Sequence, residues 1–199
     1  MSSTLKFALP ALLLLSGCFG GAPDPPRYFK PLQASPAPPG AKPAEGRRLE
    51  LSSVSAGEHL RDRIVWRKSD VELGFYDLER WTEAPAVYLQ RALATELFER
   101  RGLRRATRAP QLTLFVELRA FEEVLLPKHT ARVRIGASLL DANQTAVWER
   151  TFAADRAVKS EDPEAFARAI GAALTRVVDE LAGAVEASAA GLPAGDPPG

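Results

Sequence analysis

Residues 80–102 constrain the fold of this chain most, because they have the pattern of an amphipathic helix with a marked start and end. Thr82 is a candidate N-cap, Pro85 suits the first turn, and Gly102 suits a left-handed C-cap. At 3.6 residues per turn, one face is apolar and must cover a core that other segments supply. The apolar face contains Ala86, Leu89, Leu93 and Leu97, widened by Val87, Ala94 and Phe98; Arg91, Thr95, Glu96 and Glu99 lie opposite.

The segments around this helix have strand patterns. Residues 112–119 and 131–139 alternate between apolar and polar side chains, and residues 62–67 and 71–76 form a predicted hairpin around Lys68-Ser69-Asp70. If the two alternating strands pair, we expect Glu117 to lie near Arg132 or Arg134. Further strands are predicted at residues 27–32, 48–54 and 146–152, a helical turn at 58–61 and an extended loop at 33–46.

A second amphipathic helix is predicted after Asp162, with Asp162 as its cap and Pro163 in its first turn. Its apolar stripe contains Phe166, Ile170, Leu174, Val177, Leu181 and Val185. The predicted sheet has one apolar face, and each predicted helix has an apolar face that must be buried. Together these elements predict an α+β fold. We expect a two-layer sandwich in which a mostly antiparallel sheet carries both helices on one face.

A family resemblance follows from one group of motifs. The run Ile64-Val65-Trp66-Arg67, then Phe75-Tyr76, then Arg80-Trp81-x-Glu83-x-Pro85 ahead of a helix, resembles the ABC-type transport auxiliary lipoproteins. That family includes the lipoprotein partners of MCE-type (paraquat-inducible-like) intermembrane lipid transport systems. The resemblance implies an MCE-domain protein with its permease and ATPase as partners, and rings formed by self-association, as in some relatives.

The N-terminus has the pattern of a bacterial lipoprotein signal. A short basic region, residues 1–6, precedes an apolar run, residues 7–15, that is too short to span a bilayer. Leu15-Ser16-Gly17-Cys18 then resembles a lipobox, so Cys18 is expected to carry diacylglyceryl and N-acyl lipid after cleavage. The alternative is an ordinary secretory signal with an incidental cysteine. Phe19 rather than Asp follows Cys18, which resembles an outer-membrane sorting signal.

These patterns divide the chain into four regions: a signal peptide at 1–17, a lipidated tether at 18–26, a folded domain at 27–187 and a disordered tail at 188–199. The 17 residues before Cys18 contain one base and no acid, so the remainder carries 25 bases and 25 acids. This neutral balance argues against nucleic acid as the main partner. The expected location is the periplasmic side of a Gram-negative envelope, at the outer membrane.

Catalytic and metal-binding motifs are missing from the sequence. The two histidines, His59 and His129, are far apart, and Cys18 is the only cysteine. No G-x-S-x-G, H-E-x-x-H or phosphate-binding glycine loop is present. We therefore expect no enzyme, no cofactor besides the lipid on Cys18 and no metal, although a triad assembled in space is not visible in a sequence.

Several exposed or junction residues are candidates for contact with a partner or with lipid. Trp81 is either a core anchor or a partner-contact residue. The apolar run Val124-Leu125-Leu126-Pro127 either folds back on the sheet or contacts a partner or lipid. The basic cluster at Arg100, Arg101, Arg104, Arg105 and Arg108 is either a solvated helix end or a contact for lipid phosphates or an acidic partner surface. The candidate contact residues are Arg80, Trp81, Glu83, Leu125 and Leu126.

Three functions agree with these observations. The first is a lipid-anchored, non-catalytic accessory subunit of an ABC/MCE lipid transport system, which the resemblance implies. The second is a lipoprotein that assembles an outer-membrane complex, for example one handling lipopolysaccharide. The third is an envelope hydrolase that depends on one of the histidines. A lipid-binding groove between the two helices is a further hypothesis within the first function.

Overall fold

The computed structural model describes residues 24–31 and 46–191. The lipobox Leu15-Ser16-Gly17-Cys18, most of the tether, the loop predicted at 33–46 except for Gly46, and the last eight residues lie outside the described part. No helix in the described ranges is both long and apolar enough to cross a membrane.

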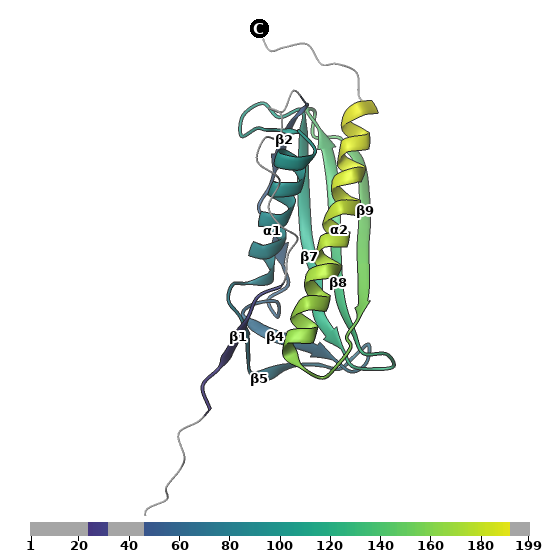
Figure 1. Cartoon of the computed structure of the whole chain (residues 1–199). Helices are drawn as coiled ribbons and strands as arrows, with labels where there is room; N and C mark the ends of the chain where they lie inside the picture. The colour runs from purple at the N-terminus through teal and green to yellow at the C-terminus, as the bar shows by residue number, and fades with distance from the viewer. Residues whose placement is uncertain (1–23, 32–45, 192–199) are drawn as a thin grey trace, which may run out of the picture.

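A long antiparallel meander forms the body of the sheet (Figure 1). It consists of β7 (Leu112–Val124), β8 (Thr130–Asp141) and β9 (Ala146–Ala157). The alternation in the first two strands predicts this pairing correctly, and β9 extends five residues beyond the predicted end.

Shorter strands complete the other edge of β7 in three pieces. β2 (Arg48–Leu51), β3 (Ser55–Ala56) and β4 (Arg63–Arg67) each pair with β7 in parallel. β4 also forms the predicted antiparallel hairpin with β5 (Leu73–Trp81). β1 (Arg27–Phe29) adds to β5, and β6 (Arg104–Arg105) adds to β2, both in parallel. The predicted α+β class is confirmed, and its sheet is mixed.

Both helices lie on one face of this sheet, as predicted (Figure 1). α1 (Pro85–Ala94) packs near β7, and α2 (Pro163–Gly191) packs over β8 and β9 and against α1. All six residues of the predicted α2 stripe are buried, and the Asp162 carboxylate accepts the backbone N–H of Glu164 at 3.0 Å. α2 continues through Ser188, whose hydroxyl accepts the Trp148 indole N–H at 2.8 Å, so the predicted tail at 188 begins too early.

The first helix differs from its prediction at both ends. The N-cap position is Ala84 rather than Thr82, because β5 runs to Trp81 and two further residues are needed to reverse the chain. α1 continues as a wider π-helical segment, η1 (Thr95–Arg100), in which Arg101 N–H bonds to the Glu96 carbonyl. Gly102 has φ +67°, which confirms the left-handed C-cap.

Two predicted side-chain roles near this helix are also corrected. Val87 is exposed, and Tyr88 takes its place in the buried stripe. Arg101 is not part of a solvated cluster, because its guanidinium bonds to Glu96 at 3.1 Å and to Asp179 and Glu186 of α2, each at 2.6 Å. Arg101 therefore joins the end of the first helix to the second.

The register between β7 and β8 differs from the expected one. Glu117 lies opposite Gly136, and its carboxylate pairs with Arg119 at 2.7 Å instead of with Arg132 or Arg134. The reason is that β7 extends to Val124, so the turn is short and Arg132 falls opposite Glu122. A bulge between Leu118 and Ala120 shifts the register further.

An aromatic cluster around Trp81 holds the two layers together. The Trp81 ring centroid lies 6.4 Å from Tyr88 of α1, 5.3 Å from Phe121 of β7 and 5.8 Å from Phe166 of α2. Trp81 is 1% exposed and is therefore a core residue. Its indole N–H is buried without a hydrogen-bond partner among the described residues, so it contributes through packing.

We expect Trp81→Ala to lower the free energy of unfolding by about 3–5 kcal/mol, because it opens a cavity where three elements meet. Val87→Ala is the matched control, since this side chain is 42% exposed, and we expect a change of about 0.5 kcal/mol or less. Urea denaturation measures both. Equal losses for the two variants would contradict the central role of Trp81.

Candidate functional site

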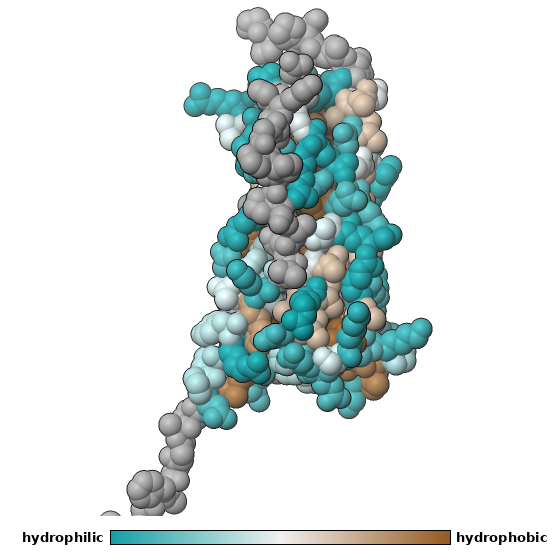
Figure 2. Space-filling view, in the orientation of Figure 1, coloured by the Kyte–Doolittle hydropathy of each residue, from teal (hydrophilic) through white to brown (hydrophobic). Residues whose placement is uncertain are grey.

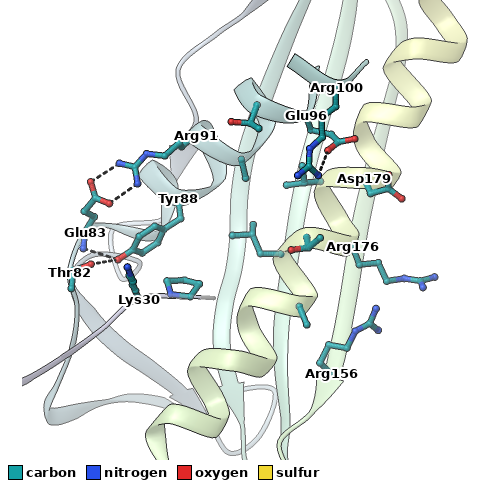
Figure 3. Close-up of a pocket in the computed structure, with 17 residues that line it drawn as sticks. Lys30, Thr82, Glu83, Tyr88, Arg91, Glu96, Arg100, Arg156, Arg176 and Asp179 are labelled. Atoms are coloured by element: carbon teal, nitrogen blue, oxygen red, sulfur yellow. Dashed lines mark hydrogen bonds and ion pairs between the residues drawn. The ribbon is translucent and has the colours of Figure 1, made fainter. Parts of the chain in front are cut away.

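A groove of about 740 Å³ runs between α1 and α2 on the helical face (Figure 3). One wall comes from α1 and η1, the other from α2, and Lys30 and Pro31 lie at one end. Its floor is apolar because the buried side chains of Leu174 and Val178 lie there. The rim is charged and includes Lys30, Glu83, Arg91, Glu96, Arg100, Arg156, Arg176 and Asp179.

Most of the rim charges are already paired. Arg91 donates two hydrogen bonds to the Glu83 carboxylate, at 2.8 and 3.0 Å, and Figure 3 shows this fork at the edge of the groove. These hydrogen bonds lower the pKa of Glu83 and raise the pKa of Arg91. Arg176 pairs with Glu180 at 2.8 Å. Lys30 forms no ion pair within the described residues, and Arg156 donates only to the neighbouring Asp155 carbonyl, which leaves a positive surplus.

The Tyr88 hydroxyl organises the chain reversal beside this groove. The Glu83 backbone N–H donates to it at 3.0 Å, and the Thr82 hydroxyl lies 2.7 Å away (Figure 3). Thr82 therefore stabilises the start of α1 through Tyr88 and not as a cap. Tyr88 was missed in the sequence because its contacts lie five and six residues back, outside the i, i+3 and i+4 pattern of a helix.

The structure places the Arg-Trp-x-Glu-x-Pro residues in one junction between β5 and α1. Arg80 donates to the carbonyls of Tyr76 and Glu79, each at 3.1 Å, and lies 3.8 Å from the Asp62 carboxylate. Trp81 is in the core, and Glu83 is on the groove rim. Pro85 occupies the first turn of α1. These contacts fix the chain reversal, and only Glu83 reaches the groove.

The other candidate residues, Leu125 and Leu126, lie at the β7–β8 turn, away from the groove. The Leu125 backbone N–H donates to the Arg67 carbonyl at 2.8 Å, and its side chain is half-buried. Leu126 is 54% exposed. The apolar run is thus divided: Val124 and Leu125 fold against the sheet, and Leu126 points outward.

One side-chain cluster has residue types that occur in active sites. The Tyr76 hydroxyl donates to the Glu123 carboxylate at 2.6 Å, and His129 Nε2 lies 2.5 Å from its other oxygen. Glu123 is 6% exposed. Within the described residues, no hydroxyl bonds to either histidine, and no group of three ligands suits a metal ion. Tyr76 and His129 together provide hydrogen-bond partners for both oxygens of this buried carboxylate.

We expect Tyr88→Phe to lower the free energy of unfolding by about 1 kcal/mol, because the Glu83 N–H loses its acceptor. Glu83→Gln is the control, since it changes only a solvent-exposed ion pair, and we expect almost no effect. Chemical denaturation of both variants checks this. A larger loss for Glu83→Gln would assign the chain reversal to the ion pair instead.

Tyr76 predicts a dependence of stability on pH. Burial, and next the hydrogen bond to Glu123, raise the pKa of Tyr76 above its ordinary value of 10.0. The stability from the protonated hydroxyl is therefore fully present below the unfolded pKa and is lost as the pH rises above it. Between about pH 9.5 and 11.5, we expect the free energy of unfolding to fall less in Tyr76→Phe than in the native chain. The exposed Tyr28→Phe serves as control and should follow the native curve; identical slopes for all three proteins would refute the assignment.

Comparison with known proteins places this fold and site in context. The sequence model of the family described as "ABC-type transport auxiliary lipoprotein component" matches residues 30–182. A crystal structure from Xanthomonas campestris, assigned to the family DUF330, is 24% identical with a TM-score of 0.71, covering 81% of this chain and 96% of that one. A hypothetical protein from Chlamydia trachomatis is 9% identical with a TM-score of 0.56, covering 72% and 98%.

At these identities the solved structures establish the fold alone. Comparison with curated proteins gives no match. The family match spans the sheet from the end of β1 and most of α2, including the whole β5–α1 junction and the groove. The chain therefore belongs to the family of ABC-type transport auxiliary lipoprotein components.

Proposed function

We propose that this protein is a non-catalytic, lipid-anchored accessory subunit of an ABC-type intermembrane lipid transport system, and that it docks on the periplasmic MCE component. The observation that carries the proposal is the family match across residues 30–182. The transporter permease and ATPase would be its indirect partners. The proposed role is binding rather than turnover.

The proposed anchor is Cys18 with a diacylglyceryl group on sulfur and an acyl chain on its amine. A single acyl chain binds a membrane only marginally, whereas three chains hold a protein stably. The domain would then stand on the periplasmic side of the envelope, at the outer membrane. Leu15, Ser16 and Gly17 would form the recognition site of the signal peptidase.

The proposed docking surface is the groove between α1 and α2. It has an apolar floor and two cations, Lys30 and Arg156, without a carboxylate partner in the described residues. Such a surface fits an amphipathic segment with acidic side chains. Self-association is proposed as well, because β9 and β6 each pair on only one side within the described sheet.

Co-purification from the native host tests this function. We expect the native chain, isolated from solubilised membranes, to carry the MCE protein encoded with its transporter, and Lys30→Glu with Arg156→Glu to reduce recovery about tenfold or more. Arg104→Glu with Arg108→Glu is the control, since these exposed arginines lie outside the groove. Unchanged recovery in both double variants would reject docking through the groove.

A Cys18→Ser variant separates anchoring from docking. When a cleavable secretory signal replaces residues 1–17 of this variant, we expect it to move from the membrane to the soluble periplasmic fraction, while retaining the MCE protein in a pull-down from detergent extract. If no transporter component is recovered with the native chain or with this variant, an outer-membrane assembly role becomes the better proposal, and the co-purified proteins identify it.

A further inference from the structure

Two turns lie together at one end of the domain (Figure 1). They are the β4–β5 turn, residues 68–72, and the β7–β8 turn, residues 125–129. The hydrogen bond from Leu125 N–H to the Arg67 carbonyl, at 2.8 Å, ties one to the other. We call this surface the double-turn end.

The double-turn end exposes apolar side chains. Val71 is 96% exposed and Leu126 is 54% exposed, and they come from different turns. Figure 2 shows brown, apolar atoms among hydrophilic ones at the lower end of the molecule. Leu73 adds a further partly exposed side chain at the start of β5. Exposed apolar side chains that gather at one end of a domain are candidates for contact with a membrane or with another protein.

A hollow of about 660 Å³ separates the turns, and cations outnumber anions along it. Four cationic side chains line it, and its only lining carboxylates are Asp70 and Asp155. Arg67 is held by buried Glu122 at 2.7 Å, and Arg132 by Asp155 at 3.1 Å, so both are committed to the protein. Lys68 and Lys128 have no ion pair or hydrogen bond from their side chains within the described residues.

The lysines and the exposed apolar residues therefore form an amphipathic set. An ammonium group beside an exposed leucine or valine matches the boundary of a bilayer, where phosphates lie above the acyl chains. Lysines near such a surface gain attraction to lipid phosphate, while the apolar side chain enters the headgroup layer. The two lysine ammonium groups and the exposed apolar area thus point to the same ligand.

The position of the N-terminus favours a membrane over a protein partner as the surface that the double-turn end contacts. Figure 1 shows β1 leaving the molecule at the end that carries the β4–β5 and β7–β8 turns, while the C-terminal end of α2 lies at the opposite end. Six residues lead from Cys18 to Asp24, the first described residue, and a chain of that length reaches about 20 Å at most. A lipid on Cys18 would hold this end of the domain beside the bilayer.

We propose that the double-turn end contacts the membrane that carries the anchor, with Lys68 and Lys128 on lipid phosphates and Val71 and Leu126 in the headgroup layer. This inference rests on the anchoring part of the proposed function, but not on MCE docking. Its consequence is a fixed orientation: the domain stands on its turns, with the α1–α2 groove facing sideways into the periplasm.

Site-specific labelling of the full, lipidated chain tests the proposal. Cys18 is the only cysteine and is blocked as a thioether after acylation, so one introduced cysteine takes a polarity-sensitive fluorophore. Labels at Val71→Cys, Leu126→Cys and Asn143→Cys are compared in vesicles of phosphatidylethanolamine and phosphatidylglycerol. Asn143 is the control because it is exposed in the β8–β9 turn at the opposite end.

We expect nitroxide-bearing lipid to quench the labels at Val71 and Leu126 at least about threefold more than the label at Asn143. Lys68→Glu with Lys128→Glu should reduce quenching at Leu126 several-fold, whereas Arg104→Glu with Arg108→Glu should not. Inorganic phosphate at millimolar concentration should compete little; loss of quenching with it would indicate a free-anion site and overturn the proposal. Quenching at Asn143 equal to that at the turns would overturn it as well.

Flotation of the same vesicles distinguishes failure of the anchoring proposal from failure of the membrane-contact proposal. Protein that fails to float with the vesicles has no functional anchor, and the anchoring proposal fails. Protein that floats with unquenched turn labels retains its anchor, and only the orientation proposed here fails. Quenching that appears only when the MCE protein is added would assign the double-turn end to a protein partner and reject membrane contact.

Discussion

The packing of Trp81 between the sheet and both helices is the interaction on which the rest of this structure depends. Trp81 ends β5, four residues before Pro85 begins α1, and its ring touches aromatic residues from α1, β7 and α2. The sheet has only one apolar face, so both helices must lie there, and a large rigid ring at their junction sets how far apart they stand. Tyr88 connects this junction to the groove between α1 and α2, because it packs against Trp81 and also lines the groove.

The family motif gains a physical meaning from this arrangement. Arg80 donates hydrogen bonds to two backbone carbonyls of β5, and Trp81 packs in the core. Pro85 begins α1, where its missing N–H costs no helical hydrogen bond. Glu83 contributes an exposed ion pair that adds little to stability. The motif is therefore mainly a device for turning a strand into a helix, and its presence predicts the fold more reliably than a binding site.

Local patterns in the sequence predicted the helices and strands, but they did not predict strand register or contacts between residues far apart in the chain. The α2 stripe, the Asp162 cap, the β7–β8 pairing and the C-cap at Gly102 follow from periodicity and glycine chemistry. The Glu117 register does not, because it depends on where a turn closes and on a bulge. The role of Arg101 depends on carboxylates 78 and 85 residues away, which no local pattern reports.

The candidate surfaces were also predictable only where they depend on local sequence. The sequence marked Leu125 and Leu126 because an apolar turn is unusual, and the structure shows that only Leu126 is largely exposed. It did not pair them with Lys68 and Val71, since the two turns meet only through the parallel alignment of β4 with β7. The groove has walls from helices more than 60 residues apart, so only the folded chain brings Lys30 and Arg156 to one rim.

The division of surfaces between the double-turn end and the helical face carries a functional argument. A short tether alone leaves a domain free to rotate, and rotation lowers the effective concentration of any docking surface toward a fixed partner. Contact through the double-turn end would remove much of that freedom, because the proposed lipid on Cys18 and the two proposed lysine–phosphate contacts would define an orientation together. The groove would then face along the membrane surface. A partner beside the domain would find the groove already in the orientation that docking needs. Near-neutral overall charge fits this arrangement, since a strongly basic domain would adhere to lipid through several faces.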